Sequence, residues 1–284
     1  MTIFEAYNST KKKLEKVGIE DYVFEAKQII KHITGLNASQ ILTSYNKELT
    51  LFQQNNLTAL LHQREVRYPL QYIFGEWDFY GRPYYVGPGV LVPRADTETV
   101  IEAGLEYLKE KENPEILDLC AGSGCIGITF AREREDSKVL MVEKYDEAIN
   151  YTQKNIYKND APNSEVVKGD IFEGTLGDGR FDLIVSNPPY ISEDEWKEIS
   201  PETHFEPETA LKAKDNGLEF YKAIAKNYKN SLKEGGMLLF EVGYKQAEKV
   251  AEILKNEGYN DIKFKKDLGG INRAVSGIIQ RKEE

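Results

Sequence analysis

The stretch "ILDLCAGSGCIGI" (116–128) decides the fold. Its first four residues include three branched aliphatic side chains, which is typical of a buried strand, and glycines follow almost at once. Gly122 and Gly124 permit positive φ and allow a ligand close to the backbone, and a helix that begins here offers unpaired N–H groups. A strand, a glycine turn and a helix in this order predict a unit of a parallel α/β sheet that binds a small molecule.

The rest of the chain from residue 96 onward continues this alternation of strands and helices. The last two strands have no helix between them, so we expect them to pair antiparallel. The sequence therefore predicts an α/β fold with a doubly wound, mostly parallel, seven-stranded sheet. The expected strands are 115–119, 138–142, 165–168, 181–186, 236–242, 262–266 and 274–280, and the expected helices are 97–110, 125–133, 146–157, 217–232 and 245–257.

The start of the chain has a different pattern. Apolar residues recur there at helical spacing, Gly18 and Gly35 are suited to ending helices, and Asn37 is suited to capping the stretch 37–49. A stretch rich in aromatic residues, glycine and proline follows and indicates a hairpin. We predict a small helical bundle at 1–70, which is either a structural cap or a unit that docks a substrate, a connecting hairpin at 71–95 and an α/β domain at 96–284.

Composition restricts the function further. The chain has 284 residues, of which 40% are hydrophobic and 30% charged, and no apolar run approaches the ~18 residues of a membrane helix. Two cysteines and three scattered histidines predict neither a disulfide scaffold nor a metal site. The beginning lacks the pattern of a secretory signal, so we expect a cytoplasmic protein, without a membrane partner and monomeric.

The net charge of −10 is unevenly distributed. Residues 1–70 contain nine Lys/Arg and seven Asp/Glu, which gives +2, and the remainder contains 28 against 40, which gives −12. An acidic domain without a basic stripe is poorly suited to a long phosphate backbone. We therefore expect no direct binding to DNA.

Two cofactors compete for the glycine turn. Gly122, Gly124 and Gly127 form G-x-G-x-x-G, the pattern of dinucleotide sites, which is weak evidence alone. Asp118 at the strand end would repel a pyrophosphate but would attract an ammonium group such as that of S-adenosylmethionine. Glu143 ends the next strand, where its carboxylate can accept both ribose hydroxyls.

Asp170 and Ile171 follow a third strand at the same edge, where they suit the amino group and the ring of an adenine. Together these residues favour S-adenosylmethionine over NAD. The predicted cofactor-binding residues are Asp118, Cys120, Ala121, Gly122, Ser123, Gly124, Glu143, Asp170, Ile171 and Asn187.

The stretch "FDLIVSNPPY" (181–190) ends a buried strand in a rigid turn. We interpret Asn187, Pro188, Pro189 and Tyr190 as the catalytic residues. The Asn187 side-chain oxygen and the Pro188 carbonyl can accept the two N–H groups of a planar amide or amine, and Tyr190 can stack on its face. Such positioning can contribute ~7–11 kcal/mol to catalysis.

These motifs resemble one known family along almost the whole chain, the peptide chain release factor glutamine N5-methyltransferases (the PrmC/HemK family of class I methyltransferases). Further stretches carry the resemblance. They are "PLQYIFGEWDFYG" (69–81), "VLVPRADTET" (90–99), "VVKGDIF", "SNPPYIS" (186–192), "FEPETAL" (205–211), "DNGLEFY" (215–221) and "KDLGGINRAVSG" (266–277). One departure is Cys120, where the family usually has glycine, and its side chain narrows the expected methionine pocket.

The resemblance implies an S-adenosylmethionine-dependent enzyme that methylates the glutamine of the Gly-Gly-Gln motif in class 1 release factors. It also implies that the N-terminal bundle helps to hold that protein. "NPPY" is shared with adenine and guanine amino methyltransferases, so a nucleic-acid amino methyltransferase stays an alternative. Further alternatives are a ribosomal-protein glutamine methyltransferase and a cofactor-binding regulator without catalysis.

Overall fold

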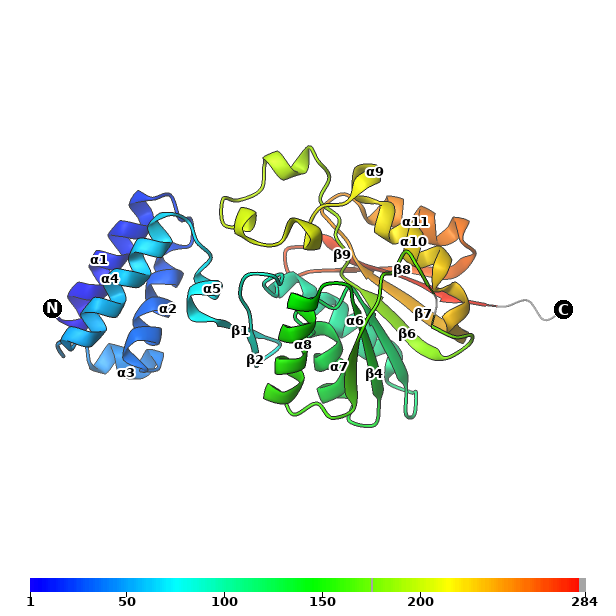
Figure 1. The fold of residues 1–284 in the computed structure, drawn as a ribbon, viewed down its shortest axis with the longest axis horizontal. Helices are drawn as coiled ribbons and strands as arrows, with labels where there is room; N and C mark the ends of the chain where they lie inside the picture. The colour runs from blue at the N-terminus through cyan, green and yellow to red at the C-terminus, as the bar shows by residue number, and fades with distance from the viewer. Residues whose placement is uncertain (175, 281–284) are drawn as a thin grey trace. The chain divides into compact units, whose positions relative to one another are not determined.

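The computed structural model describes residues 1–174 and 176–280 and divides into two compact units (Figure 1). The first unit comprises Met1–Gly75 together with Pro201–Phe205, and the second comprises Glu76–Ser200 and the chain from Glu206 onward. Within the described residues, no helix is long and apolar enough to cross a membrane. The same residues contain no group of three His, Cys, Asp or Glu side chains placed to hold a metal ion.

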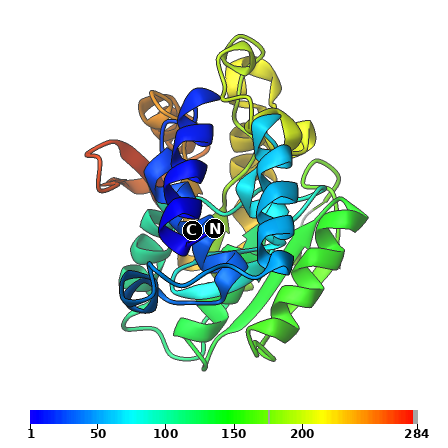
Figure 2. The ribbon, with the colours of Figure 1, turned by 90° about the vertical axis from the view of Figure 1, so that its left-hand side faces the viewer.

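The first unit is a bundle of helices, coloured blue to cyan in Figure 2. Its helices are α1 (Ile3–Lys16), α2 (Tyr22–Thr34), α3 (Ala38–Thr43), α4 (Leu51–Glu65) and α5 (Leu70–Phe74). Their apolar faces meet in one core, which includes the buried side chains Leu14, Ile29, Ile30, Leu57 and Leu61. The expected helical bundle is present.

Local signals fix the helix ends of this unit. Thr2, Asn37 and Thr50 each form a capping box at the start of a helix, and Gly35 ends α2 with a φ of 69°. The predicted Asn37 cap and Gly35 stop are confirmed. The prediction of a helix along 37–49 is too long, because α3 ends at Thr43 before a run of Ser, Tyr and Asn, which are weak helix formers.

A buried arginine holds the segment Pro201–Phe205 within the first unit. The Arg64 side chain is 1% exposed and makes paired hydrogen bonds of 2.8 and 2.9 Å to the Glu25 carboxylate. It also donates to Glu202 Oε1 at 2.9 Å, and Arg67 donates to Glu202 Oε2 at 2.8 Å. Two carboxylates thus compensate the buried charge, as a buried guanidinium requires.

The second unit contains a hairpin and a seven-stranded sheet. In the hairpin, β1 (Glu76–Phe79) pairs antiparallel with β2 (Arg82–Tyr85), as predicted for this region. The sheet strands are β3 (Glu115–Leu119), β4 (Lys138–Glu143), β5 (Ser164–Lys168), β6 (Phe181–Ser186), β7 (Leu232–Glu241), β8 (Tyr259–Lys266) and β9 (Asn272–Ile279). The helices are α6 (Glu98–Leu108), α7 (Cys125–Glu133), α8 (Asp146–Lys158), α9 (Lys214–Gly217), α10 (Glu219–Asn227) and α11 (Ala247–Asn256).

The strand order β5-β4-β3-β6-β7-β9-β8 confirms the predicted fold class. The first five strands in this order run parallel, and β9 is antiparallel to both β7 and β8. The direction of progression reverses between β3 and β6. In an open α/β sheet, such a reversal opens a crevice at the carboxyl ends of the strands, where ligands bind.

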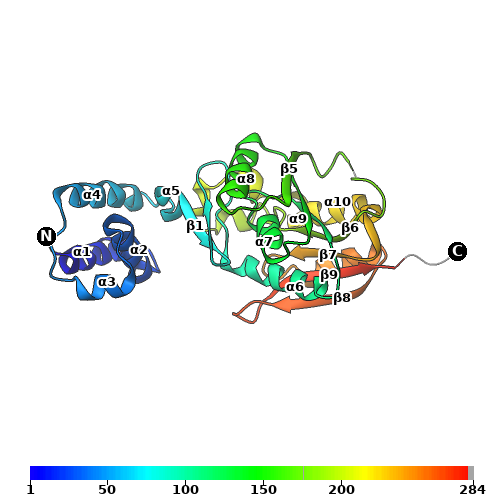
Figure 3. The ribbon, with the colours of Figure 1, turned by 90° about the horizontal axis from the view of Figure 1, so that it is seen from below.

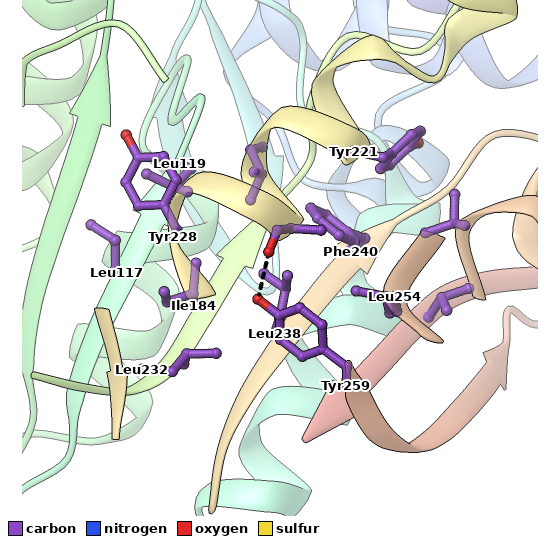
Figure 4. Close-up of a cluster of buried hydrophobic side chains, with 14 of the residues drawn as sticks. Leu117, Leu119, Ile184, Tyr221, Tyr228, Leu232, Leu238, Phe240, Leu254 and Tyr259 are labelled. Atoms are coloured by element: carbon purple, nitrogen blue, oxygen red, sulfur yellow. Dashed lines mark hydrogen bonds between the residues drawn. The ribbon is translucent and has the colours of Figure 1, made fainter. Parts of the chain in front are cut away.

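Helices cover both faces of the sheet (Figure 3). On one face, α10 and α11 pack on the strands in a cluster that includes Ile184, Tyr221 and Leu254. Figure 4 shows part of this cluster, in which the Tyr259 hydroxyl donates to the Ala225 carbonyl at 3.1 Å. On the other face, α6 and α7 bury residues such as Ile101 and Phe130. The buried sheet therefore forms a rigid base for the residues at its carboxyl edge.

The helix predicted at 217–232 is wrong at both ends. The helix α10 covers Glu219–Asn227, and β7 already begins at Leu232, which pairs with Phe181 of β6. Sheet pairing prevails over local helix propensity here. Before α10, Asp215 and Asn216 have φ values of 56° and 53°, so the short element α9 is a left-handed turn that periodicity does not reveal.

Candidate active site

A cavity lies at the carboxyl ends of β3, β4 and β6, where a ligand is expected in an open α/β sheet. Nine residues predicted from the sequence line it, namely Cys120, Ala121, Gly122, Ser123, Glu143, Asp170, Ile171, Asn187 and Pro189. Four others do not line it, namely Asp118, Gly124, Pro188 and Tyr190. Residues predicted for the cofactor and residues predicted for the acceptor thus both line one cavity, although the set is not complete.

The glycine loop adopts left-handed backbone geometry at three alternate positions. Cys120, Gly122 and Gly124 have φ values of 62°, 56° and 78°. At Gly124 a Cβ would lie 2.7 Å from Thr152 Cγ2, so a side chain does not fit there. Thr152 also donates its hydroxyl to Gly122 O at 2.8 Å. Helix α8 therefore holds the loop from outside and leaves its inner surface to the ligand.

The buried amide of Asn155 on α8 adds a second clamp. It donates to Ser123 O at 2.9 Å and to Tyr85 O at 3.1 Å, and it accepts from Tyr85 N at 2.6 Å. One side chain thus joins the glycine loop to β2 of the hairpin. This gives the aromatic hairpin a structural function beside the cofactor site.

Asp118 is turned toward the start of α7. Its side chain is 0% exposed, and Oδ2 accepts from Gly127 N at 2.9 Å. Oδ1 has no hydrogen-bond partner in the described part of the chain. Burial raises the pKa of Asp118 to about 8, against the effect of the Gly127 hydrogen bond. Its predicted contact with the cofactor ammonium stays a prediction, and the observed contact is structural.

Glu143, the last residue of β4, connects this strand to the glycine loop in the part of the cavity predicted to hold the cofactor. Its Oε2 accepts from Gly122 N at 2.9 Å, and its Oε1 accepts from the backbone N–H groups of Lys144 and Tyr145 at 2.8 and 3.0 Å. A carboxylate offers about four lone-pair positions. Three are used, so the fixed carboxylate at the cavity wall retains capacity for a ribose hydroxyl.

The part of the cavity wall that follows β5 combines the charge of Asp170 with apolar rings. Asp170 Oδ1 accepts from Phe172 N at 3.0 Å, and Oδ2 lies 2.6 Å from Lys144 Nζ. Burial opposes ionisation of Asp170, but the bonds from Lys144 and Phe172 outweigh it and lower its pKa. Ile171 is buried beside it, and the rings of Phe172 and Phe220 meet edge to face at 5.0 Å. A carboxylate beside apolar side chains is suited to a flat ring with a polar edge, such as adenine.

The donor set therefore fits S-adenosylmethionine. The loop approaches a ligand through its backbone, Glu143 suits a ribose, and the Asp170–Phe172 wall suits an adenine. Sequence reasoning missed the two phenylalanines, Phe172 and Phe220. Phe172 directly follows the predicted Ile171, and Phe220 lies in the stretch 215–221 that carried the family resemblance. These positions were the only signals available in the sequence.

The acceptor end is built around Asn187. It follows β6 and lines the cavity, and its Nδ2 donates to Thr97 Oγ1 at 3.4 Å. The backbone of Tyr190 is held twice, since its N–H donates to Leu211 O at 3.1 Å and its carbonyl accepts from Gln246 Nε2 at 3.0 Å. Its hydroxyl donates to Glu241 Oε1 at 3.5 Å. Stacking of Tyr190 on an acceptor stays a prediction.

Two further groups were not identified from the sequence as site residues. Glu206 is 4% exposed, accepts from Val92 N at 2.8 Å and forms an ion pair with Arg94, which lines the cavity. Thr97 also lines the cavity, and its hydroxyl donates to the buried Glu241 at 2.5 Å. Both groups come from stretches quoted for the family resemblance, without any chemical role assigned to them.

The fold and this site define a class I methyltransferase. Among solved structures, a human Mettl16 catalytic domain in complex with an RNA hairpin has a TM-score of 0.57 at 17% identity, over 80% of this chain and 84% of that one. A Pyrococcus furiosus methyltransferase has a TM-score of 0.53 at 19% identity, over 81% and 98%. At these identities the likeness shows the fold.

Sequence comparisons identify the family. Residues 98–206 match the methyltransferase small domain, and residues 5–75 match the PrmC N-terminal domain. The release factor glutamine methyltransferase of Fusobacterium nucleatum is 37% identical over 95% of this chain and 77% of its own length. That of Thermodesulfovibrio yellowstonii is 36% identical over 90% and 92%. The chain belongs to the release factor glutamine methyltransferase family, and the predicted S-adenosylmethionine-dependent methyltransferase is confirmed.

Proposed function

We propose that this chain transfers the methyl group of S-adenosylmethionine to the side-chain amide nitrogen (N5) of glutamine in the Gly-Gly-Gln motif of class 1 peptide chain release factors. The names of its relatives support a release factor substrate. The observation that carries the proposal is the placement of Asn187. Its amide lines the cavity immediately after β6, and its Nδ2 is already bonded to Thr97.

This placement suits an amide acceptor. With Nδ2 bonded to Thr97, Asn187 Oδ1 is the atom left to accept an N–H from the substrate. An amide nitrogen is a weak nucleophile because its lone pair is conjugated with the carbonyl. Holding it in line with the methyl group is therefore the main contribution of the protein, and such alignment can be worth about 7–11 kcal/mol.

The reaction balances without a dedicated base. The bound cofactor supplies an electrophilic methyl group, whose bond to sulfur breaks as the bond to nitrogen forms. The nitrogen becomes acidic as it is alkylated and loses one proton to water. The products are methylated glutamine, S-adenosylhomocysteine and the proton. In this scheme Asn187 binds and orients the acceptor through its side-chain oxygen.

Incubation with labelled S-adenosylmethionine tests the substrate. Separate samples would contain a class 1 release factor, ribosomes, tRNA and DNA, and a release factor with its Gly-Gly-Gln glutamine replaced by alanine is the matched control. We expect label in the intact release factor alone. Label in ribosomes, tRNA or DNA instead would favour one of the alternative methyltransferases. The expectation of a cytoplasmic monomer stays a prediction.

We also propose that the N-terminal unit docks the release factor. Its helix α4 exposes Leu51 and Phe52, which are 74% and 73% accessible although both are apolar. A contact limited to the glutamine amide is too small to select one protein among many, so additional surface must supply affinity. Exposed apolar side chains on a separate unit are suited to that role.

Replacing Leu51 and Phe52 together by serine tests this docking role in the full chain. We expect a raised KM for the intact release factor and an unchanged rate with a short Gly-Gly-Gln peptide. Leu268→Ser is the control, because Leu268 is a fully exposed apolar residue on the other unit, in the turn between β8 and β9. An unchanged KM for the intact factor in the double variant would contradict docking through α4.

A further inference from the structure

A buried carboxylate lies behind the acceptor end of the cavity. Glu241 is the last residue of β7 and is 2% exposed. Its Oε2 accepts from the Thr97 hydroxyl at 2.5 Å, and its Oε1 accepts from the Tyr190 hydroxyl at 3.5 Å. The cavity walls include Thr97 but not Glu241. The carboxylate therefore acts on the site through other side chains.

The chemistry of this carboxylate fixes the direction of the hydrogen bonds. An ionised carboxylate can only accept, so the Thr97 hydroxyl must donate to it. A hydroxyl has a single proton to donate, and Thr97 Oγ1 can otherwise only accept. It accepts from Asn187 Nδ2 at 3.4 Å. The orientation of the Asn187 amide, with Nδ2 toward Thr97, follows from the charge on Glu241.

We propose that Glu241 and Thr97 are positioning residues that decide which end of the Asn187 amide faces the methyl acceptor. This inference rests on the proposed function, in which Asn187 Oδ1 accepts an N–H from the glutamine amide. A reversed amide would present its NH₂ group to the acceptor N–H, and two donors cannot bond to each other. The same charge also orients the Tyr190 hydroxyl.

The surroundings of Glu241 make this arrangement sensitive to pH. Arg273 on β9 is a cation that acts on Glu241, and it also forms ion pairs with Asp96 at 3.1 Å and Asp267 at 3.2 Å. Tyr221 on α10 donates to the Glu241 backbone carbonyl at 3.1 Å. Asp96, Cys125 on α7 and the hydroxyls of Thr97 and Tyr190 also interact with Glu241.

Burial raises the pKa of Glu241 to about 7, while the Thr97 hydrogen bond and Arg273 act in the opposite direction. Ionisation is therefore lost as the pH falls through about 7. A protonated Glu241 can donate to Thr97, which frees the threonine hydroxyl to donate to Asn187 and to reverse its amide. Methyl transfer should decline on the acidic side of this pKa, although the cofactor contacts are untouched.

Thr97→Val and Thr97→Ser form a matched pair, since valine removes the hydroxyl at nearly constant shape and serine retains it. We expect Thr97→Val to lower kcat by about ten- to hundredfold, the range of a misplaced reacting group. Thr97→Ser should recover most of this loss, and the S-adenosylmethionine Kd from calorimetry should stay within about threefold for both variants, since neither removes a cofactor contact. Glu241→Gln should abolish the acidic decline in kcat, because an amide does not titrate.

A structural measurement separates this inference from the proposed function. In ¹⁵N spectra of the protein without cofactor, the Asn187 side-chain NH₂ signals, assigned by their loss in Asn187→Ala, should shift in Thr97→Val and remain near their original positions in Thr97→Ser. Absence of methylation by the unaltered protein would contradict the proposed substrate, but the shift of the Asn187 NH₂ signals would still support the positioning role. A Thr97→Val variant with normal kcat or with unshifted Asn187 signals would overturn the positioning role.

Discussion

The two ends of the cavity are held in different ways. At the cofactor end, Glu143 bonds to three backbone N–H groups, and two of them belong to the residues that directly follow it. At the acceptor end, Asn187 and Tyr190 are held by side chains from distant parts of the chain, namely Thr97, Glu241 and Gln246. The Glu143 carboxylate is thus fixed mainly by local backbone groups, whereas alignment of a weak nucleophile requires several elements to converge.

Asn187→Ala should separate the two ends most sharply. It removes the side-chain oxygen that holds the acceptor, so we expect methyl transfer to fall by at least about a hundredfold. Cofactor affinity should change only a few-fold, because the bonds of Glu143 and Asp170 remain. Calorimetry with S-adenosylmethionine and a methylation assay on the same protein measure both quantities. Turnover near the normal rate would refute the assignment of the acceptor end.

Glu143→Ala should produce the opposite effect. It removes the carboxylate proposed to hold the ribose and leaves Gly122 N without its acceptor. We expect the free energy of cofactor binding to weaken by about 1.5–3 kcal/mol, the value of one hydrogen bond to a charged group, because the carboxylate retains one lone-pair position for the ribose. Titration calorimetry measures the Kd. If the Kd for S-adenosylmethionine did not change, the ribose would lie elsewhere in the cavity.

Gln246→Ala should affect the acceptor end indirectly. The Gln246 side chain bonds to Tyr190 O at 3.0 Å and to Gly243 N at 3.1 Å, and it is 6% exposed. Removing it leaves two buried groups unpaired, so we expect unfolding to become easier by about 1–3 kcal/mol. Denaturant titration measures this loss, and kcat should fall while the cofactor Kd stays constant. A variant with reduced cofactor affinity but normal kcat would show that the two ends are not separately supported.

The same difference explains what the sequence could predict. The strands, the glycine turn, Glu143 and Asn187 follow from short patterns, because strand ends of a parallel sheet meet at one edge. Glu241 also ends an apolar strand, but unlike Glu143 it does not end the strand that follows the glycine turn, where a ribose-binding carboxylate is expected. Its role depends on β7 lying beside β6 and on the turn that holds Thr97. Such long-range pairings have no local signal.

Predicted residues that do not line the cavity show the same limit. Asp118 has the expected position at the end of β3, but its carboxylate turns to Gly127 N at the start of α7. Tyr190 lies in the predicted turn, but its hydroxyl faces the buried Glu241. Backbone position follows from sequence pattern, whereas the direction of a side chain depends on which partner the fold brings near it.

Cys120 offers the finest test of the cofactor end, where the smallest change is expected. Its φ of 62° lies in the left-handed region that favours glycine. Burial raises the pKa of its thiol, so the group stays protonated and unreactive. Two costs of the side chain must be separated, namely backbone strain and space taken from the cavity that it lines.

Cys120→Gly and Cys120→Ala distinguish these two costs. Alanine retains the Cβ and its strain of about 1–2 kcal/mol, while glycine removes that strain but adds about 0.4–1 kcal/mol of unfolded-state entropy. We therefore expect the glycine variant to be more stable than the alanine variant by less than about 1.5 kcal/mol, measured by denaturant titration without cofactor. Both variants remove the sulfur, so both should bind S-adenosylmethionine more tightly if space is limiting. Tighter binding by the glycine variant alone would instead assign the cost to the loop backbone. An alanine variant more stable than the glycine variant would show that the strain at residue 120 is smaller than the entropic cost of a glycine there.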